Sequence, residues 1–187
     1  ITKKNIIEQT ALRLFVENGI RDTSVRDIAT KSNSTEAALY RHYNSKDDMA
    51  KKLFIAILEK FSAELEKTFE LKANSINQKM EQIIDFIYDF YEQNTIEFYF
   101  LVLRFYDFPK DDELFNKSNP NDIIAKYMNQ IINKYNIKVD NLTFTISLIM
   151  GIIIQPIITY YYGRLKENPI AYKNQIKNIC INILSSK

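Results

Sequence analysis

The side chains that most often carry out chemistry are scarce in this chain, and their scarcity excludes several kinds of site. The 187 residues include one histidine, His42, and one cysteine, Cys180. A Cys/His zinc site and an internal disulfide framework are excluded, because each needs more such residues than the chain has. The three glycines, at 19, 151 and 163, form neither a GxGxxG nor a GxxxxGK loop for phosphate. Since no nucleophile and base pair can be assembled around His42, we expect no enzyme activity, no cofactor and no metal.

The distribution of charge is the next chemical signal. Residues 1–60 hold 11 Lys and Arg against 8 Asp and Glu, a net charge of +3, while residues 61–187 hold 14 against 15, a net charge of −1. We therefore expect any anionic partner to bind the N-terminal third of the chain.

Four helices must position these charges within the first third. Gly19 is placed to end the first helix, and Ser24 with Asp27 forms a capping box that begins the second. Asn33 stands where the chain must turn, and Asn tolerates the left-handed backbone region. Together these signals predict helices over residues 3–18, 25–32, 36–42 and from 46 onwards.

The second and third helices are short and are joined by a tight turn, which is the pattern of a helix-turn-helix. Ala29 is small enough to let the two helices approach closely, while Ile28, Leu39 and Tyr43 supply apolar contacts between them. The pattern favours DNA binding. A three-helix packing unit with no DNA role fits the same residues.

The residues also resemble a known family. Segments 15–20 (FVENGI), 23–29 (TSVRDIA) and 39–49 (LYRHYNSKDDM) follow, in order and spacing over about residues 5–55, the pattern of the TetR (tetracycline-repressor-like) family. The resemblance implies an all-α fold, with a three-helix DNA-binding head over residues 1–47 and a helical effector-binding and dimerisation body over residues 48–187. It also implies a cytoplasmic, ligand-responsive transcriptional regulator, by default a repressor, which binds a palindromic operator as a homodimer.

The resemblance assigns DNA contacts to the second and third helices and to the start of the fourth. The side chains expected to approach phosphates are Thr23, Ser24, Tyr40, His42 and Lys46. Those expected to read base edges are Thr35, Glu36, Ala37 and Arg41, with Arg41 suited to a bidentate contact with guanine. Glu36 stands where the family often has a basic residue. Its carboxylate either accepts a hydrogen bond from cytosine or complements the helix N-terminus, and we favour the second role.

The rest of the chain predicts longer, apolar helices, over residues 51–69, 80–93, 96–108, 123–135, 139–165 and 170–184. Residues 142–162 carry no charge and are long enough to cross a membrane, but their Thr, Ser, Gln and Pro156 favour a buried or interfacial helix. The resemblance implies that the last two helices pair with their copies in a homodimer, without a membrane. Cys180 is expected on this dimer face as a small apolar residue.

The middle helices hold the effector pocket in this family. Their aromatic content favours a small apolar or aromatic ligand, although the same rings fit an ordinary core. The expected ligand-binding residues are Phe61, Phe86, Phe90, Phe98, Leu103 and Tyr106. An alternative function is a helical protein-interaction module whose head has lost specific DNA binding.

Overall fold

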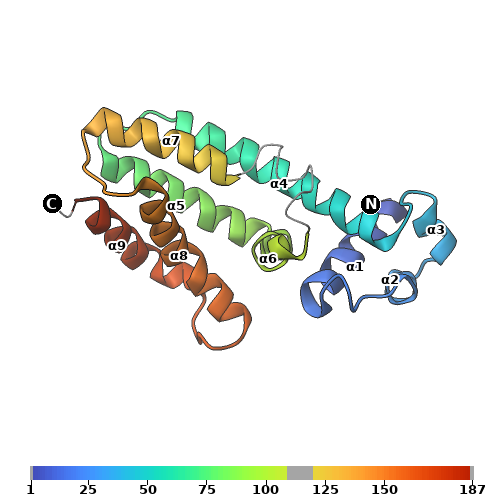
Figure 1. Ribbon diagram of the computed structural model, residues 1–187. Helices are drawn as coiled ribbons and strands as arrows, with labels where there is room; N and C mark the ends of the chain where they lie inside the picture. Colours follow the sequence, from blue (N-terminus) through green and yellow to red (C-terminus); the bar gives the residue numbers. More distant parts are fainter. Residues whose placement is uncertain (1, 109–119, 186–187) are drawn as a thin grey trace. The chain divides into compact units, whose positions relative to one another are not determined.

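The computed structural model describes residues 2–108 and 120–185, and across them the chain is all-α, as the sequence predicts (Figure 1). Contacts between helices divide the chain into two compact units. The first is Ile1–Glu59 with Asn94–Lys117, and the second is Lys60–Gln93 with Ser118–Lys187. One helix, α4 (Lys46–Glu70), begins in the first unit and ends in the second.

The first unit contains the predicted head together with a helix expected to belong to the body. Its other elements are α1 (Lys3–Asn18), α2 (Val25–Lys31), α3 (Glu36–Tyr40), α6 (Thr95–Arg104) and the 3-10 turn η1 (Phe105–Asp107). Phe100 of α6 stacks on Phe15 of α1 with ring centroids 6.0 Å apart, and it meets Phe54 of α4 edge-on at 5.8 Å. The packing units therefore do not coincide with the predicted division at residue 47, which stays a prediction about functional domains.

The second unit is a bundle of longer helices around α5. It contains the end of α4, α5 (Ile76–Gln93), α7 (Pro120–Tyr135), α8 (Leu142–Tyr161), the 3-10 turn η3 (Pro169–Tyr172) and α9 (Lys173–Ser185). Helix α9 packs against α5 through a face in which Ile176, Cys180 and Leu184 are buried. Helix α7 lies beside the end of α4, where the rings of Phe69 and Tyr127 stack 4.7 Å apart (Figure 1).

Helix α8 is unusual because most of its surface is apolar but little of it is buried. Within the described part of the chain it is the one helix long and apolar enough to cross a membrane, by length and composition alone. Its buried residues are Ile149, Ile153 and Ile157, which lie four residues apart on a single face. Phe144 and Leu148 are exposed, so much of the apolar surface of α8 is uncovered in one protomer.

The predicted boundaries are wrong at the end of α6. The apolar pattern predicts a helix to Phe108, whereas the α-helix ends at Arg104 and Phe108 is extended, with φ −93° and ψ 145°. The next residue, Pro109, explains the extended backbone of Phe108, because a residue before proline is sterically driven out of the helical region; Phe105–Asp107 form the 3-10 turn η1.

Candidate nucleic-acid interface

The turn between α1 and α2 is held by a glycine and a buried hydroxyl. Gly19 ends α1 with φ 90°, and its N–H donates to the carbonyl of Phe15 at 3.1 Å. Thr23 is only 1% exposed, and its hydroxyl oxygen lies 3.2 Å from the carbonyl oxygen of Leu14 and 2.8 Å from that of Gly19. This burial disfavours the predicted phosphate contact through the Thr23 hydroxyl, which stays a prediction. The hydroxyl is held inside the head, where it fixes the turn.

Ser24 begins α2 through the predicted capping box, which is confirmed. Its hydroxyl accepts from the N–H of Asp27 at 3.0 Å, and the Asp27 carboxylate accepts from the N–H of Ser24 at 3.2 Å. Hydrogen bonds from the Ser24 hydroxyl and then from its N–H hold the pKa of Asp27 below its ordinary value. Ser24 is exposed, and its contact with DNA stays a prediction.

The turn between α2 and α3 has the left-handed residue that the sequence predicts. Asn33 has φ 49°, and the following N–H, of Ser34, donates to the carbonyl of Ala29 at 2.8 Å. Ile28 and Leu39 are fully buried on either side of this turn. The two short helices are thus fixed to each other by a backbone hydrogen bond and an apolar contact layer.

The outer surface of α3 presents the residues predicted to read bases. Thr35 caps the helix by accepting from the N–H of Ala38 at 3.2 Å, so the Glu36 carboxylate is not needed for that hydrogen bond. Thr35, Glu36 and Ala37 are all exposed, and Tyr40 is 51% exposed. These four side chains lie on one accessible surface.

Arg41 and His42 follow α3 instead of lying within it, since the helix ends at Tyr40. Arg41 keeps helical angles, φ −66° and ψ −24°, so its exposed side chain continues the surface of α3. The His42 ring is exposed beside Tyr43, 6.5 Å away edge-on. Tyr43 is buried and donates a hydrogen bond to the Glu8 carboxylate; its burial, then that bond, raises its pKa. Tyr43 therefore fixes the residues that follow α3 to α1.

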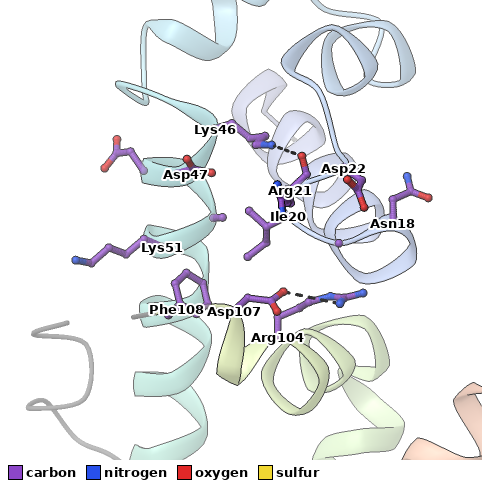
Figure 2. A pocket seen from close by; sticks show the side chains of 13 residues that line it. Asn18, Ile20, Arg21, Asp22, Lys46, Asp47, Lys51, Arg104, Asp107 and Phe108 are labelled. Carbon is purple, nitrogen blue, oxygen red and sulfur yellow. Dashed lines mark hydrogen bonds and ion pairs between the residues drawn. The ribbon is translucent and has the colours of Figure 1, made fainter. Parts of the chain in front are cut away.

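Lys46 begins α4 and is hydrogen-bonded to the turn between α1 and α2. Its ammonium donates to the carbonyl of Arg21 at 3.0 Å, at the edge of a cavity of about 900 Å³ within the first unit (Figure 2). The N–H of Asp48 donates to the Ser45 hydroxyl at 3.0 Å, as expected for a helix start at this position. Lys46 is half-buried, and its predicted phosphate contact stays a prediction.

Arg104 joins α6 to the end of α1 and is the residue that sequence reasoning missed. Its Nε donates to the carbonyl of Phe15 at 2.9 Å and its Nη2 to the carbonyl of Val16 at 2.7 Å. Its Nη1 lies 3.8 Å from Asp107 (Figure 2). A guanidinium on the last carbonyls of a helix complements the negative end of its dipole. No local signal marks this contact, because the partners lie 88 and 89 residues apart in sequence.

The structure brings together three of the six residues predicted to bind an effector. The Phe61 ring lies 5.2 Å from Phe86 and 5.0 Å from Phe90, and the last two rings are 6.1 Å apart. Phe61 and Phe90 are buried, so the described chain shows this cluster as packed rings in the second unit. Their contact with a ligand stays a prediction.

The other three residues predicted to bind an effector lie in the first unit, apart from the phenylalanine cluster. Phe98 is buried in α6 and Leu103 is half-buried near its end. Tyr106 falls in η1 and is 88% exposed. Tyr106 therefore lies outside the helix that the sequence predicts for it, and its contact with a ligand stays a prediction.

Acidic residues of α5 pair with lysines at the start of α9. Asp85 lies 3.0 Å from Lys173 and 2.7 Å from Lys177, and Asp89 lies 3.3 Å from Lys173. Burial alone would raise the pKa of Asp85, but hydrogen bonds from Lys177 and Lys173 outweigh burial and lower that pKa. These charges therefore fasten α9 to α5.

Comparison with known proteins identifies the head. The family model described as "Bacterial regulatory proteins, tetR family" matches residues 7–53. Residues 7–53 are therefore similar to the DNA-binding head of the TetR family. The HTH-type transcriptional repressor KstR2 of Mycobacterium tuberculosis is 29% identical over 77 residues, which cover 41% of this chain and 38% of that repressor. The match therefore spans well under two thirds of this relative.

Two solved structures share the fold of this chain over nearly its whole length. The regulator PfmR from Thermus thermophilus has 17% identity and a TM-score of 0.74, with 96% of this chain and 97% of that one covered. FadR from Bacillus subtilis, solved with stearoyl-CoA, has 19% identity and a TM-score of 0.74, with 98% and 99% covered. At these identities the likeness establishes the fold.

Proposed function

We propose that this chain is a TetR-family transcriptional regulator, by default a repressor, that binds an operator in duplex DNA in the cytoplasm. The observation that carries the proposal is the exposed surface of α3, where Thr35, Glu36, Ala37, Tyr40 and Arg41 are accessible while Ile28 and Leu39 are buried behind them. A helix rigidly held on a helix-turn-helix, with its outer side chains free, is suited to the major groove. The repressor KstR2 supports the repressor role.

Binding to duplex DNA at several salt concentrations tests this proposal. Phosphate contacts release counterions, so the affinity should fall steeply as salt rises. Lys46→Ala should weaken binding to all sequences alike and reduce the salt slope by about 1, whereas Arg41→Ala should relax the preference for one base pair. Arg13→Ala, on an exposed position of α1, is the control. If a selection from random duplex sequences enriches no sequence that the wild-type protein binds, the alternative function of a protein-interaction module is favoured.

The proposed regulator acts as a homodimer through α8 and α9. Phe144 is 62% exposed, Leu148 44%, Tyr162 61% and Ile179 41%, so both helices carry uncovered apolar side chains. Exposed apolar patches of this kind mark protein interfaces. A Leu148→Glu substitution should convert a dimer into a monomer in sedimentation velocity runs, whereas Ile6→Glu, at an exposed apolar position of α1, should not. A wild-type protein that stays monomeric at micromolar concentration would contradict the proposal.

The proposed effector is a small apolar molecule bound in the body. FadR from Bacillus subtilis was solved with stearoyl-CoA, and this supports an acyl chain as one candidate ligand. The cluster of Phe61, Phe86 and Phe90 is the proposed contact, because an apolar ligand gains most from aromatic surroundings. An effector that prefers one body conformation would shift operator affinity through α4, which is a single helix shared by both units. Operator affinity that does not change as stearoyl-CoA saturates the protein would refute stearoyl-CoA as the effector.

A further inference from the structure

A second cavity, of about 550 Å³, lies in the body unit, between the end of α4, the segment that joins α4 to α5, and α7. Its volume is within the range of small-molecule sites. None of the six residues expected to bind an effector lines it. We call it the corner cavity. Its lining residues include Leu71, Lys72, Lys79, Ile131 and Lys134.

The corner cavity has an excess of positive charge. Three lysines, Lys72, Lys79 and Lys134, line it together with a single carboxylate, Glu70. Neither Lys72 nor Lys134 forms an ion pair within the described residues, and the only partner found there for the Lys134 ammonium is the ring of its neighbour Tyr135, 5.2 Å away. The electrostatic potential of the cavity therefore favours an anion.

Lys79 makes this excess of charge unusual, because its side chain is buried. The residue is 6% exposed, and its ammonium donates to the carbonyls of Thr68 at 3.4 Å, Phe69 at 3.0 Å and Leu71. Buried lysines are rare unless they are paired with an acid, and within the described residues this one has no carboxylate partner; its ammonium is held instead by carbonyls at the C-terminal end of α4, which complement part of its charge. Burial, and then the nearby charge of Lys134, lowers the pKa of Lys79. An anion in the cavity would offset both effects.

The walls of the corner cavity are apolar and aromatic beside these charges. Phe69 and Tyr127 stack with parallel rings, 6° between planes, and Ile131 lies on the same helix as Tyr127. Leu71 is 55% exposed at the edge, although it is a large apolar side chain. A ligand that suits this lining has an apolar part and a negative end.

We propose that the corner cavity binds an amphipathic anion, whose carboxylate or phosphate lies between Lys72 and Lys134 and whose apolar chain covers Leu71 and Ile131. Lys79 supplies a fixed positive charge behind them. The site is separate from the phenylalanine cluster proposed for the effector, and its occupancy does not depend on DNA binding. Failure of operator binding would thus leave this proposal intact.

Titration calorimetry with three probes of equal chain length tests the proposal on the full chain without DNA. Decanoate and decyl phosphate should bind, while decanol, which has the same chain without the charge, should bind at least about tenfold more weakly. The double variant Lys72→Gln/Lys134→Gln should lose roughly five- to tenfold in affinity for the preferred anion, as expected for two partly exposed ion pairs. Tighter decanoate binding would assign a carboxylate ligand, and tighter decyl phosphate binding a phosphate ligand.

The control variant is Lys138→Gln, an exposed lysine that follows α7 and does not line the cavity. It matches the charge change of each single substitution and should leave the anion affinity unchanged. The substituted lysines at 72 and 134 are exposed, so both variants should fold. Equal binding of decanol and decanoate, no binding of either anion, or equal losses in Lys138→Gln and the double variant would each overturn the proposal.

Discussion

Arg104→Met removes the link between α6 and α1 while keeping most of the apolar stem of the side chain. The wild-type guanidinium donates two hydrogen bonds at 2.9 and 2.7 Å to the carbonyls of Phe15 and Val16, and its side chain is 19% exposed. A hydrogen bond from a charged donor contributes about 1.5–3 kcal/mol. The carbonyl of Phe15 keeps its second donor, the N–H of Gly19, and water can reach part of the site. We therefore expect the free energy of unfolding to fall by about 2–3 kcal/mol, at or just below the lower end of the sum of about 3–6 kcal/mol for the two hydrogen bonds.

Urea unfolding followed by circular dichroism measures this loss, which corresponds to roughly 4–12 °C in Tm for a chain of this size. Amide hydrogen exchange should also become faster in the last turn of α1, because the stabilised carbonyls lie there. Arg13→Met is the matched control: the residue is exposed on α1, and its loss should change stability by less than about 0.5 kcal/mol. If Arg104→Met and Arg13→Met have the same effect, Arg104 does not anchor α6 to the head.

Three further substitutions test other elements. Lys79→Met should lower the free energy of unfolding at neutral pH, because three carbonyls lose their hydrogen-bond donor. The pKa of Lys79 in the folded protein lies below 10.5, so the stability of the wild-type protein should rise with pH between that folded pKa and 10.5. Urea unfolding across this pH window should show that the rise is absent in the variant. Asp85→Asn should destabilise the protein more than Asp89→Asn does at neutral pH. In thermal melts this difference should disappear as the pH falls below 3.8 and through the lowered folded pKa of Asp85, because the carboxylate is then protonated. A difference that persists in acid would contradict the ion-pair assignment. Asn33→Ala should cost about 1 kcal/mol in chemical denaturation because of its positive φ, while Asn33→Gly should be neutral or slightly stabilising.

The local features of the head could be predicted because their causes lie within a few residues. Gly19, Ser24 with Asp27, and Asn33 all occupy the backbone positions that the sequence predicts. Each depends on a hydrogen bond or dihedral angle that the residue itself determines. Helix α1, Lys3–Asn18, agrees with its predicted bounds for the same reason.

Side-chain roles were less predictable where burial decides them. Thr23 and Ser24 are adjacent hydroxyl residues that both fit the family pattern, yet Thr23 is buried and Ser24 exposed. Helical periodicity in an apolar segment does not show where a helix ends, so Tyr106 was expected within a helix that ends two residues before it. The contact of Arg104 with α1 depends on tertiary packing across 89 residues, which no spacing rule contains.

Helix α9 shows why an apolar sequence pattern cannot distinguish residues of the protomer core from residues of an interface. Ile176, Ile179 and Cys180 fit one apolar side when read from the sequence, but Ile176 and Cys180 are buried against α5 while Ile179 is 41% exposed. Burial raises the pKa of the Cys180 thiol to about 11, so this cysteine stays protonated and belongs to the protomer core. The predicted position of Cys180 on the interface is therefore wrong. Ile179 lies beside this buried face instead of within it, and an apolar side chain left exposed there, together with the uncovered surface of α8, is what a second copy of the chain would bury.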